Sequence, residues 1–254
     1  MLRAPDPAEK LGLTRRTAIL WREGALAIGR ALPPGRPARP PRPEVRPPRE
    51  MPRRRAAGSL AGRVALLHAL AHIELNALDL AWDLIARFTA EDLPRAFYDD
   101  WVVVAAEEAK HFALLADRLA ALGHAYGDLA AHDGLWEAAQ ATAGDLLARL
   151  AVVPLVLEAR GLDVTPDMIR RLEQFGDRDS AAVLEIIYRD EIGHVAAGSR
   201  WFAWSCARRG LAPVLAYREL VRRHFKGSLK PPFNRAARDE AGFGAAFYEG
   251  LAVE

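Results

Sequence analysis

The chain contains very little cysteine: Cys206 is the only one among its 254 residues. An intrachain disulfide is therefore excluded, and so is a metal site built from several thiolates. The sequence also lacks an uncharged apolar run of the roughly 20 residues that a membrane span requires. Residues 1–30 lack the apolar core of a signal peptide. These absences predict a cytoplasmic protein in a reducing compartment, without membrane association.

The chain also has no large excess of charge of one sign, because the formal net charge is only +2 at pH 7. A net charge so close to zero gives the whole molecule no general attraction to nucleic acid.

Residues 32–57 differ from the rest, since their many prolines prevent helix and favour extended polyproline segments. The arginines of this region either contact phosphates or pair with acidic helix faces. We favour pairing, because the run lacks aromatic residues for base stacking. The basic run consists of Arg30, Arg36, Arg39, Arg42, Arg46, Arg49, Arg53, Arg54 and Arg55.

Strand-like alternation of apolar and polar residues is almost absent, so we predict an all-α fold. Residues 1–58 are expected to form an N-terminal helix, over 7–31, followed by the Pro/Arg-rich strap. Residues 59–209 are expected to form a four-helix bundle, and residues 210–254 a C-terminal strap that packs on it and ends in a short helix. The predicted bundle helices are 59–88, capped by Ser59, then 94–123, 134–160, ended by Gly161, and 179–209, with a short helix after Pro166.

Two Glu-x-x-His motifs stand out, Glu108 to His111 and Glu191 to His194. Three residues make nearly one helical turn, so each motif places a carboxylate and an imidazole on the same helix face. One such motif alone is weak evidence, because a helical protein of this size can contain one by chance. Their positions in a larger repeat carry more weight.

The repeat adds one glutamate to each motif. Glu74 precedes Glu108 by 34 positions (108 − 74), and Glu158 precedes Glu191 by 33 (191 − 158). Two helix pairs, each contributing one Glu and one Glu-x-x-His, form the ligand pattern of di-iron and di-manganese carboxylate bundles. Glu108 and Glu191 are the candidates for bridging two ions and for taking part in catalysis. The predicted metal ligands are Glu74, Glu108, His111, Glu158, Glu191 and His194.

The four glutamates fall on apolar helix faces, where an unpaired carboxylate is costly. Four such groups repel one another unless cations are present. Two divalent ions would balance the four carboxylates, with both imidazoles neutral. The alternative, in which Arg or Lys side chains satisfy the glutamates, finds only Arg160 at a matching position. Mixed carboxylate and imidazole ligation suits two Fe ions, with Mn or a mixed Mn/Fe pair as alternatives and zinc also open.

A second polar stripe lies on the opposite face of the first bundle helix from Glu74. We expect this stripe to face the surface or the Arg-rich strap rather than to bind another metal. Its members are His68, His72, Asp79 and Asp83.

Taken together, these residues resemble the ferritin-like superfamily, and more closely its uncharacterised bacterial branch known as domain of unknown function four-five-five. The resemblance covers most of the chain and implies a ferritin-like four-helix bundle with a dinuclear site, but no particular reaction. A more distant likeness is to the MiaE-type tRNA-modifying di-iron hydroxylases. The likeness is carried by His72-Ile73-Glu74, Glu107-Glu108-Ala109-Lys110-His111, Leu157-Glu158-Ala159-Arg160-Gly161-Leu162-Asp163, Asp190-Glu191-Ile192-Gly193-His194, Lys230-Pro231-Pro232-Phe233-Asn234 and Ala237-Arg238.

The function we expect is that of an O₂-dependent oxidoreductase or hydroxylase, in which metal ions do the difficult chemistry. Its partners would be O₂ or peroxide, an unknown small-molecule substrate and an electron donor. The alternatives are a ferroxidase or other iron-handling protein, a peroxide scavenger and a tRNA-modifying hydroxylase. Iron storage is less favoured, because the long terminal segments would obstruct a compact cage. The substrate and the oligomeric state, with a homodimer as one candidate, stay open.

Overall fold

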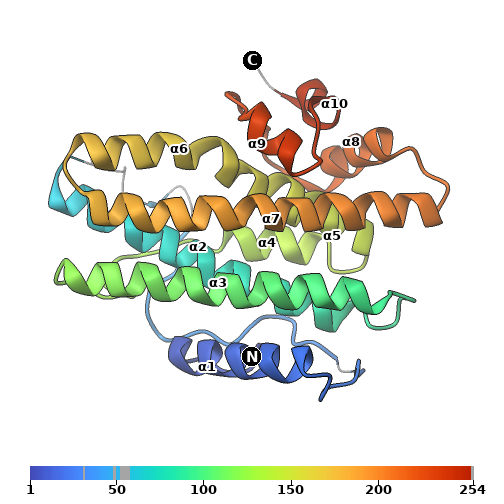
Figure 1. Cartoon of the computed structure of the whole chain (residues 1–254), viewed down its shortest axis with the longest axis horizontal. Coiled ribbons are helices and arrows are strands. Elements are labelled where there is room, and N and C mark those ends of the chain that lie inside the picture. The colour runs from blue at the N-terminus through green and yellow to red at the C-terminus, as the bar shows by residue number, and fades with distance from the viewer. Residues whose placement is uncertain (31, 48–49, 52–57, 253–254) are drawn as a thin grey trace. The chain divides into compact units, whose positions relative to one another are not determined.

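A computed structural model of the chain describes residues 1–30, 32–47, 50–51 and 58–252, and Figure 1 shows its elements in chain order. Every regular element in these residues is helical, apart from two isolated bridges such as the one between Val45 and Ala131. The all-α prediction is confirmed. Part of the predicted basic run lies outside the described residues, namely Arg49, Arg53, Arg54 and Arg55.

The described chain forms two compact units. The first consists of Met1–Trp136 and Ile169–Val183, and the second of Glu137–Met168 and Leu184–Glu254. Each unit has its own buried polar contacts. The division into an N-terminal segment, a bundle and a C-terminal strap stays a prediction.

The first unit contains three long helices: α1 (Pro7–Arg22), α2 (Leu60–Arg87) and α3 (Arg95–Ala121). Ser59 caps α2 as predicted, since its side chain accepts a hydrogen bond from the Gly62 N–H. Helix α1 is shorter than the predicted 7–31. It ends just before Gly24, whose positive φ of 73° supplies the left-handed conformation that ends helices.

Helices α2 and α3 pack together and provide much of the core of this unit. Leu67, Leu78, Ala105 and Leu115 are completely buried. Helix α2 is also long and apolar enough to cross a membrane by length and composition. However, 72% of its most apolar window is buried inside the protein, which is typical of a core helix.

The strap and α1 are tied to α2 through one buried carboxylate, that of Asp79. Lys10 Nζ lies 2.6 Å from Asp79 Oδ1, and Arg39 Nη1 lies 3.2 Å from Asp79 Oδ2. Arg39 also donates to the Asn76 side chain at 2.6 Å. Two further arginines of the strap form ion pairs, Arg36 with Asp133 and Arg46 with Glu44. Of these three arginines only Arg39 pairs with a helix face, as expected, because Asp133 precedes α4 (Gly134–Ala141) and Glu44 belongs to the strap itself.

The second unit is built from shorter helices and one π-helical turn, η2, and it shares three helices with the first unit. Helix α4 begins in the first unit, α6 ends there, and α7 starts there. The elements are α4 (Gly134–Ala141), α5 (Leu146–Val152), η2 (Val153–Glu158), α6 (Ala159–Gln174), α7 (Arg178–Arg208), α8 (Pro213–His224), α9 (Arg235–Glu240), α10 (Ala245–Tyr248) and η3 (Glu249–Leu251).

The prediction of one continuous helix over 134–160 is wrong. Helix α4 ends at Ala141, and the buried Arg149 side chain donates to the Ala139 carbonyl and to Thr142 Oγ1 at this end. Asp145 then caps α5 by accepting the Leu147 N–H. The helix is therefore interrupted between α4 and α5, where Arg149 binds the last turn of α4 and Asp145 binds a free N–H at the start of α5.

Two further boundaries differ from expectation. Gly161 does not end a helix, and Pro166 lies inside α6 rather than at the start of a short helix. The tail is also more helical than predicted, because α8 occupies part of the expected strap. Pro213 begins α8, and Tyr217 lies completely buried on it.

Candidate metal site

Glu74 on α2 and two residues of α3, Glu108 and His111, form a compact group in the first unit. His111 Nδ1 lies 3.2 Å from Glu74 Oε2 and 3.6 Å from Glu108 Oε2. One ligand atom from each residue lies within 4.8 Å of the others. The structure thus brings together one complete half of the predicted repeat. The helical spacing places Glu108 and His111 one turn apart, and the packing of α2 on α3 brings in Glu74.

This group is buried among apolar side chains. Glu108 and His111 are completely inaccessible, and Glu74 is 4% exposed. Burial alone would lower the pKa of His111, but the hydrogen bonds and charges of Glu108 and Glu74 outweigh it and raise that pKa to about 11. At neutral pH the imidazole therefore carries a proton that offsets part of the carboxylate charge.

The donor set fits a divalent metal ion. Two carboxylates and one imidazole are oxygen and nitrogen ligands of the kind that iron, manganese and zinc accept. A divalent ion in place of the His111 proton would balance the two carboxylate charges. The low exposure of Glu74, Glu108 and His111 would keep bulk water from competing for such an ion.

The second half of the repeat lies in the second unit. On α7, His194 Nδ1 lies 3.5 Å from Glu191 Oε1, and the two residues are 1% and 8% exposed. Glu191 Oε2 is buried and has no hydrogen-bond partner among the residues that the structure describes. A buried carboxylate oxygen without a donor is costly, so a cation would stabilise it. Glu158 ends the π-helical turn η2 of the same unit.

The four glutamates differ in how much of each residue is buried, although a carboxylate oxygen of Glu158, Oε2, is itself buried. Glu74, Glu108 and Glu191 are buried, whereas Glu158 is half-buried. The predicted place of Glu158 on an apolar face requires an unbroken α-helix over 134–160, with about 100° of rotation per residue. That period does not continue through a π-helical turn.

The second polar stripe of α2 is satisfied by protein groups. The Gly127 N–H donates to His68 Nε2, and the two ring nitrogens of His72 contact the Tyr126 hydroxyl at 2.8 Å and the His132 carbonyl at 3.1 Å. Burial, helped by Arg39, lowers the pKa of His72 to about 4. The neutral ring must donate from Nε2 to the carbonyl and accept the Tyr126 proton at Nδ1. The two histidines therefore do not lie on the surface: they are buried, and these hydrogen-bond partners belong to the loop that follows α3 rather than to the strap. Of the stripe, Asp79 pairs with Arg39 of the strap, as expected.

Sequence reasoning missed the residues that surround the turn carrying Glu158. Arg160, the one cation considered as a partner for the glutamates, instead donates to the Lys230 carbonyl and pairs with Asp163. Asp163 in turn binds Arg238 of α9. Asp163 and Arg238 both lie in sequence segments that carry the family resemblance. That was the signal in the sequence that could have identified them.

The fold and the buried group define an all-helical protein with a carboxylate and imidazole cluster that fits metal binding. The chain belongs to the family described as "Protein of unknown function (DUF455)", whose model matches residues 3–249. It is 44% identical over 209 residues to an "Uncharacterized protein" of Haemophilus influenzae, covering 80% of this chain and 72% of that relative. No solved structure matches the chain. Membership of the branch expected from the sequence motifs, domain of unknown function four-five-five, is thereby shown.

Proposed function

We propose that this protein is a ferritin-like carboxylate protein that binds a pair of metal ions, with iron as the first candidate. The observation that carries the proposal is the buried group of Glu74, Glu108 and His111, whose ligand atoms lie within 4.8 Å of one another. Each half of the sequence repeat supplies two glutamates and one histidine, so the proposed ligands are completed by Glu158, Glu191 and His194.

The role of these side chains is to hold cations in a dry, negatively charged environment. To bind a metal, His111 gives up the proton that Glu74 and Glu108 stabilise, so binding releases a proton. The carboxylates then neutralise the ion rather than the imidazolium. Leu67 and Leu78, which share the α2 face of Glu74 by helical spacing, are completely buried, so this face is shielded from bulk water.

We propose that the protein uses this site as an O₂-dependent oxidoreductase or hydroxylase. When bound, a pair of iron ions would supply the capacity to reduce O₂, with an external electron donor closing the cycle. The ligand set supports this class, because carboxylate-rich pairs of helices with Glu-x-x-His motifs are the recurring form of such sites.

Metal content is the first test. Protein purified from iron-supplemented cells is expected to contain about two metal ions per chain. Glu108→Gln and Glu191→Gln should each lower that content, while Glu185→Gln, at an exposed position of α7, should leave it unchanged. If the halves bind one coupled pair, each single variant loses both ions; if each half binds independently, one ion remains. A well-folded wild-type protein that binds no metal would overturn the proposal.

Oxygen consumption then separates the proposed activity from simple iron oxidation. With ferrous iron bound and a reductant supplied, continuing O₂ uptake beyond that needed to oxidise the bound iron supports an oxidoreductase. Uptake that rises in proportion to added ferrous iron, and stops when that iron is oxidised, would instead identify a ferroxidase.

A further inference from the structure

The segment that ends at Glu158 is a π-helical turn rather than α-helix. The residue that follows it, Ala159, donates its N–H to the carbonyls of Pro154 and Val156. Pro154 has no N–H to donate to the preceding turn. Such turns are rare, interrupt α-helices for a single turn and occur frequently at functional sites. Side chains from outside the helix add further hydrogen bonds to this segment.

The first outside contact comes from Tyr217 on α8. In an α-helix the Ala159 N–H would donate to the Leu155 carbonyl; here the Tyr217 hydroxyl donates to that carbonyl at 3.2 Å. Tyr217 is completely buried, and the rings of Phe202, Phe243 and Phe247 pack against it edge-on. The packed ring fixes the position of the Tyr217 hydroxyl, which binds the backbone three residues before Glu158.

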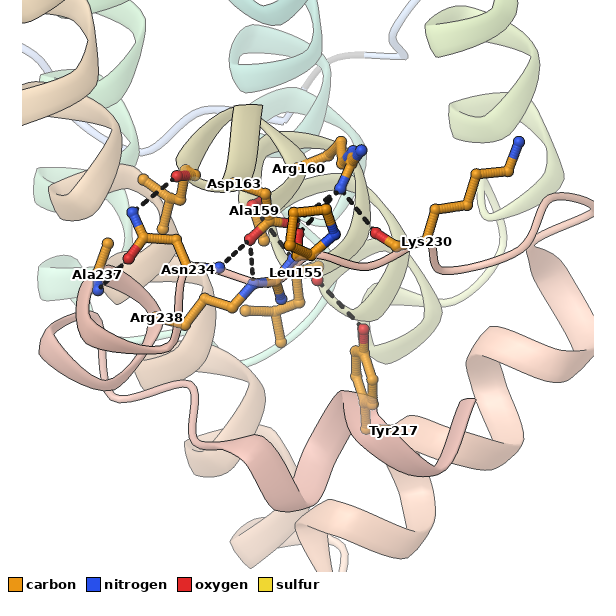
Figure 2. A network of polar contacts seen from close by, with 11 residues as sticks. Leu155, Ala159, Arg160, Asp163, Tyr217, Lys230, Asn234, Ala237 and Arg238 are labelled. Carbon is orange, nitrogen blue, oxygen red and sulfur yellow. Dashed lines mark hydrogen bonds and ion pairs between the residues drawn. The ribbon is translucent and has the colours of Figure 1, made fainter. Parts of the chain in front are cut away.

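The second contact comes from Arg238 on α9, on the other side of Glu158. Its Nη2 donates to the Ala159 carbonyl at 3.3 Å, and Nε and Nη2 bind the two Asp163 carboxylate oxygens at 2.8 and 2.7 Å. Figure 2 shows Arg238 meeting Asp163 beside Ala159, while Tyr217 reaches Leu155 separately. Three aromatic rings surround the guanidinium, those of Phe233, Phe243 and Tyr248.

A third contact compensates for a proline. Pro166 lies inside α6 and has no N–H for the Leu162 carbonyl, four residues earlier. The Asn234 side chain donates to that carbonyl at 3.1 Å, and the Asn234 N–H donates to Asp163 Oδ1 at 2.9 Å. The C-terminal segment therefore supplies donors to three carbonyls of η2 and α6, those of Leu155, Ala159 and Leu162.

We propose that Tyr217, Asn234 and Arg238 form a C-terminal clamp that positions Glu158 for metal binding. The inference rests on the proposed function, in which Glu158 is a ligand. Tyr217 binds the backbone carbonyl three residues before Glu158, and Arg238 binds the carbonyl one residue after it. These two contacts set the register of the π-helical turn. A buried ion pair such as Arg238 with Asp163 adds little net stability over apolar packing, and its use here is to restrict the turn to one arrangement.

Two matched tyrosine variants test the clamp. Tyr217→Phe removes only the hydroxyl that binds Leu155. Tyr248→Phe makes the same change in the same segment, but the Tyr248 hydroxyl has no hydrogen-bond partner within the described part of the chain. Wild-type protein and both variants are titrated with cobalt(II). We expect Tyr217→Phe to weaken binding of one of two cobalt ions about tenfold and to change the d–d absorption spectrum. Tyr248→Phe should match the wild type in both.

Hydrogen exchange of the metal-free protein gives a second readout. Tyr217→Phe should speed exchange in peptides covering 153–163, while peptides of α2 and α3 keep wild-type rates. If Tyr217→Phe fails to fold, Arg238→Lys replaces it, since lysine keeps the charge but not the paired hydrogen bonds. Two cobalt ions bound with unchanged affinity and spectrum in these clamp variants would overturn the clamp alone. No cobalt binding by folded wild-type protein would overturn the proposed function, and the clamp with it.

Discussion

Arg238 and Asp163, 75 positions apart in the sequence, form a two-pronged ion pair that is almost completely buried, with side chains 3% and 0% exposed. Both prongs are short, 2.8 and 2.7 Å, and Asp163 also accepts the Asn234 N–H. The pair fastens α9 to α6 within the second unit. Its consequences for stability can be measured directly.

Asp163→Asn should destabilise the protein by about 3–5 kcal/mol, because it leaves the Arg238 guanidinium buried without a counter-charge. Urea unfolding of wild type and variant gives the difference in free energy. The double variant Asp163→Leu, Arg238→Met removes both charges and should cost less than Asp163→Asn alone. An Asp163→Asn variant within about 1 kcal/mol of wild type would contradict this cost.

This pair also marks the limit of what the sequence could predict. The caps and periods of the long helices are local properties, so Ser59 and the one-turn spacing of Glu108 and His111 could be recognised directly. The contact between Asp163 and Arg238 joins distant segments, and no local pattern indicates it. The π-helical turn was missed for a related reason, because one of its carbonyls, that of Leu155, accepts a hydrogen bond from Tyr217 of a distant segment. The position of Glu158 on its helix was predicted from an α-helical period that does not apply in this turn.

Gly198→Ala should destabilise the second unit by about 1–3 kcal/mol, the usual cost of overpacking. A Cβ at Gly198 of α7 would lie 2.4 Å from Pro154 Cβ and 2.7 Å from its Cγ, so the π-helical turn would have to move. Gly161→Ala is the matched control, since a Cβ there meets nothing within 4 Å. It should stabilise α6 by about 0.5–1 kcal/mol, because alanine favours helix over glycine. Equal effects on the urea midpoint would contradict the close contact with Pro154.

The Cys206 thiol should react very slowly in the folded protein. The residue is completely buried, and burial raises the pKa of its thiol from 9.0 to about 11. Two pKa units correspond to about a hundredfold less thiolate at neutral pH, and the thiolate is the reactive form. A thiol-specific reagent should therefore label native protein at least about a hundredfold more slowly than urea-unfolded protein.

The same shift gives a sign for stability at alkaline pH. The folded pKa lies above the unfolded one, so the contribution of Cys206 is complete below about pH 9 and is lost as the pH rises toward 11. Stability should fall less steeply over this range in Cys206→Ala than in wild type. Parallel curves for the two proteins would show that the thiol does not ionise differently in the two states.

Metal binding should stabilise the folded protein, since the ligand group of Glu74, Glu108 and His111 is assembled only when α2 packs on α3. A metal present at about 100 times its dissociation constant adds about 2.7 kcal/mol, which corresponds to a rise in Tm of about 5–10 °C for a chain of this size. The measurement is thermal unfolding with manganese(II), and with iron(II) under anaerobic conditions, before and after addition of a chelator. Glu108→Gln should lose the rise and Glu185→Gln should keep it. An equal rise in Glu108→Gln would place the bound metal elsewhere, because the remaining carboxylate and imidazole of this group cannot hold the ion with unchanged affinity.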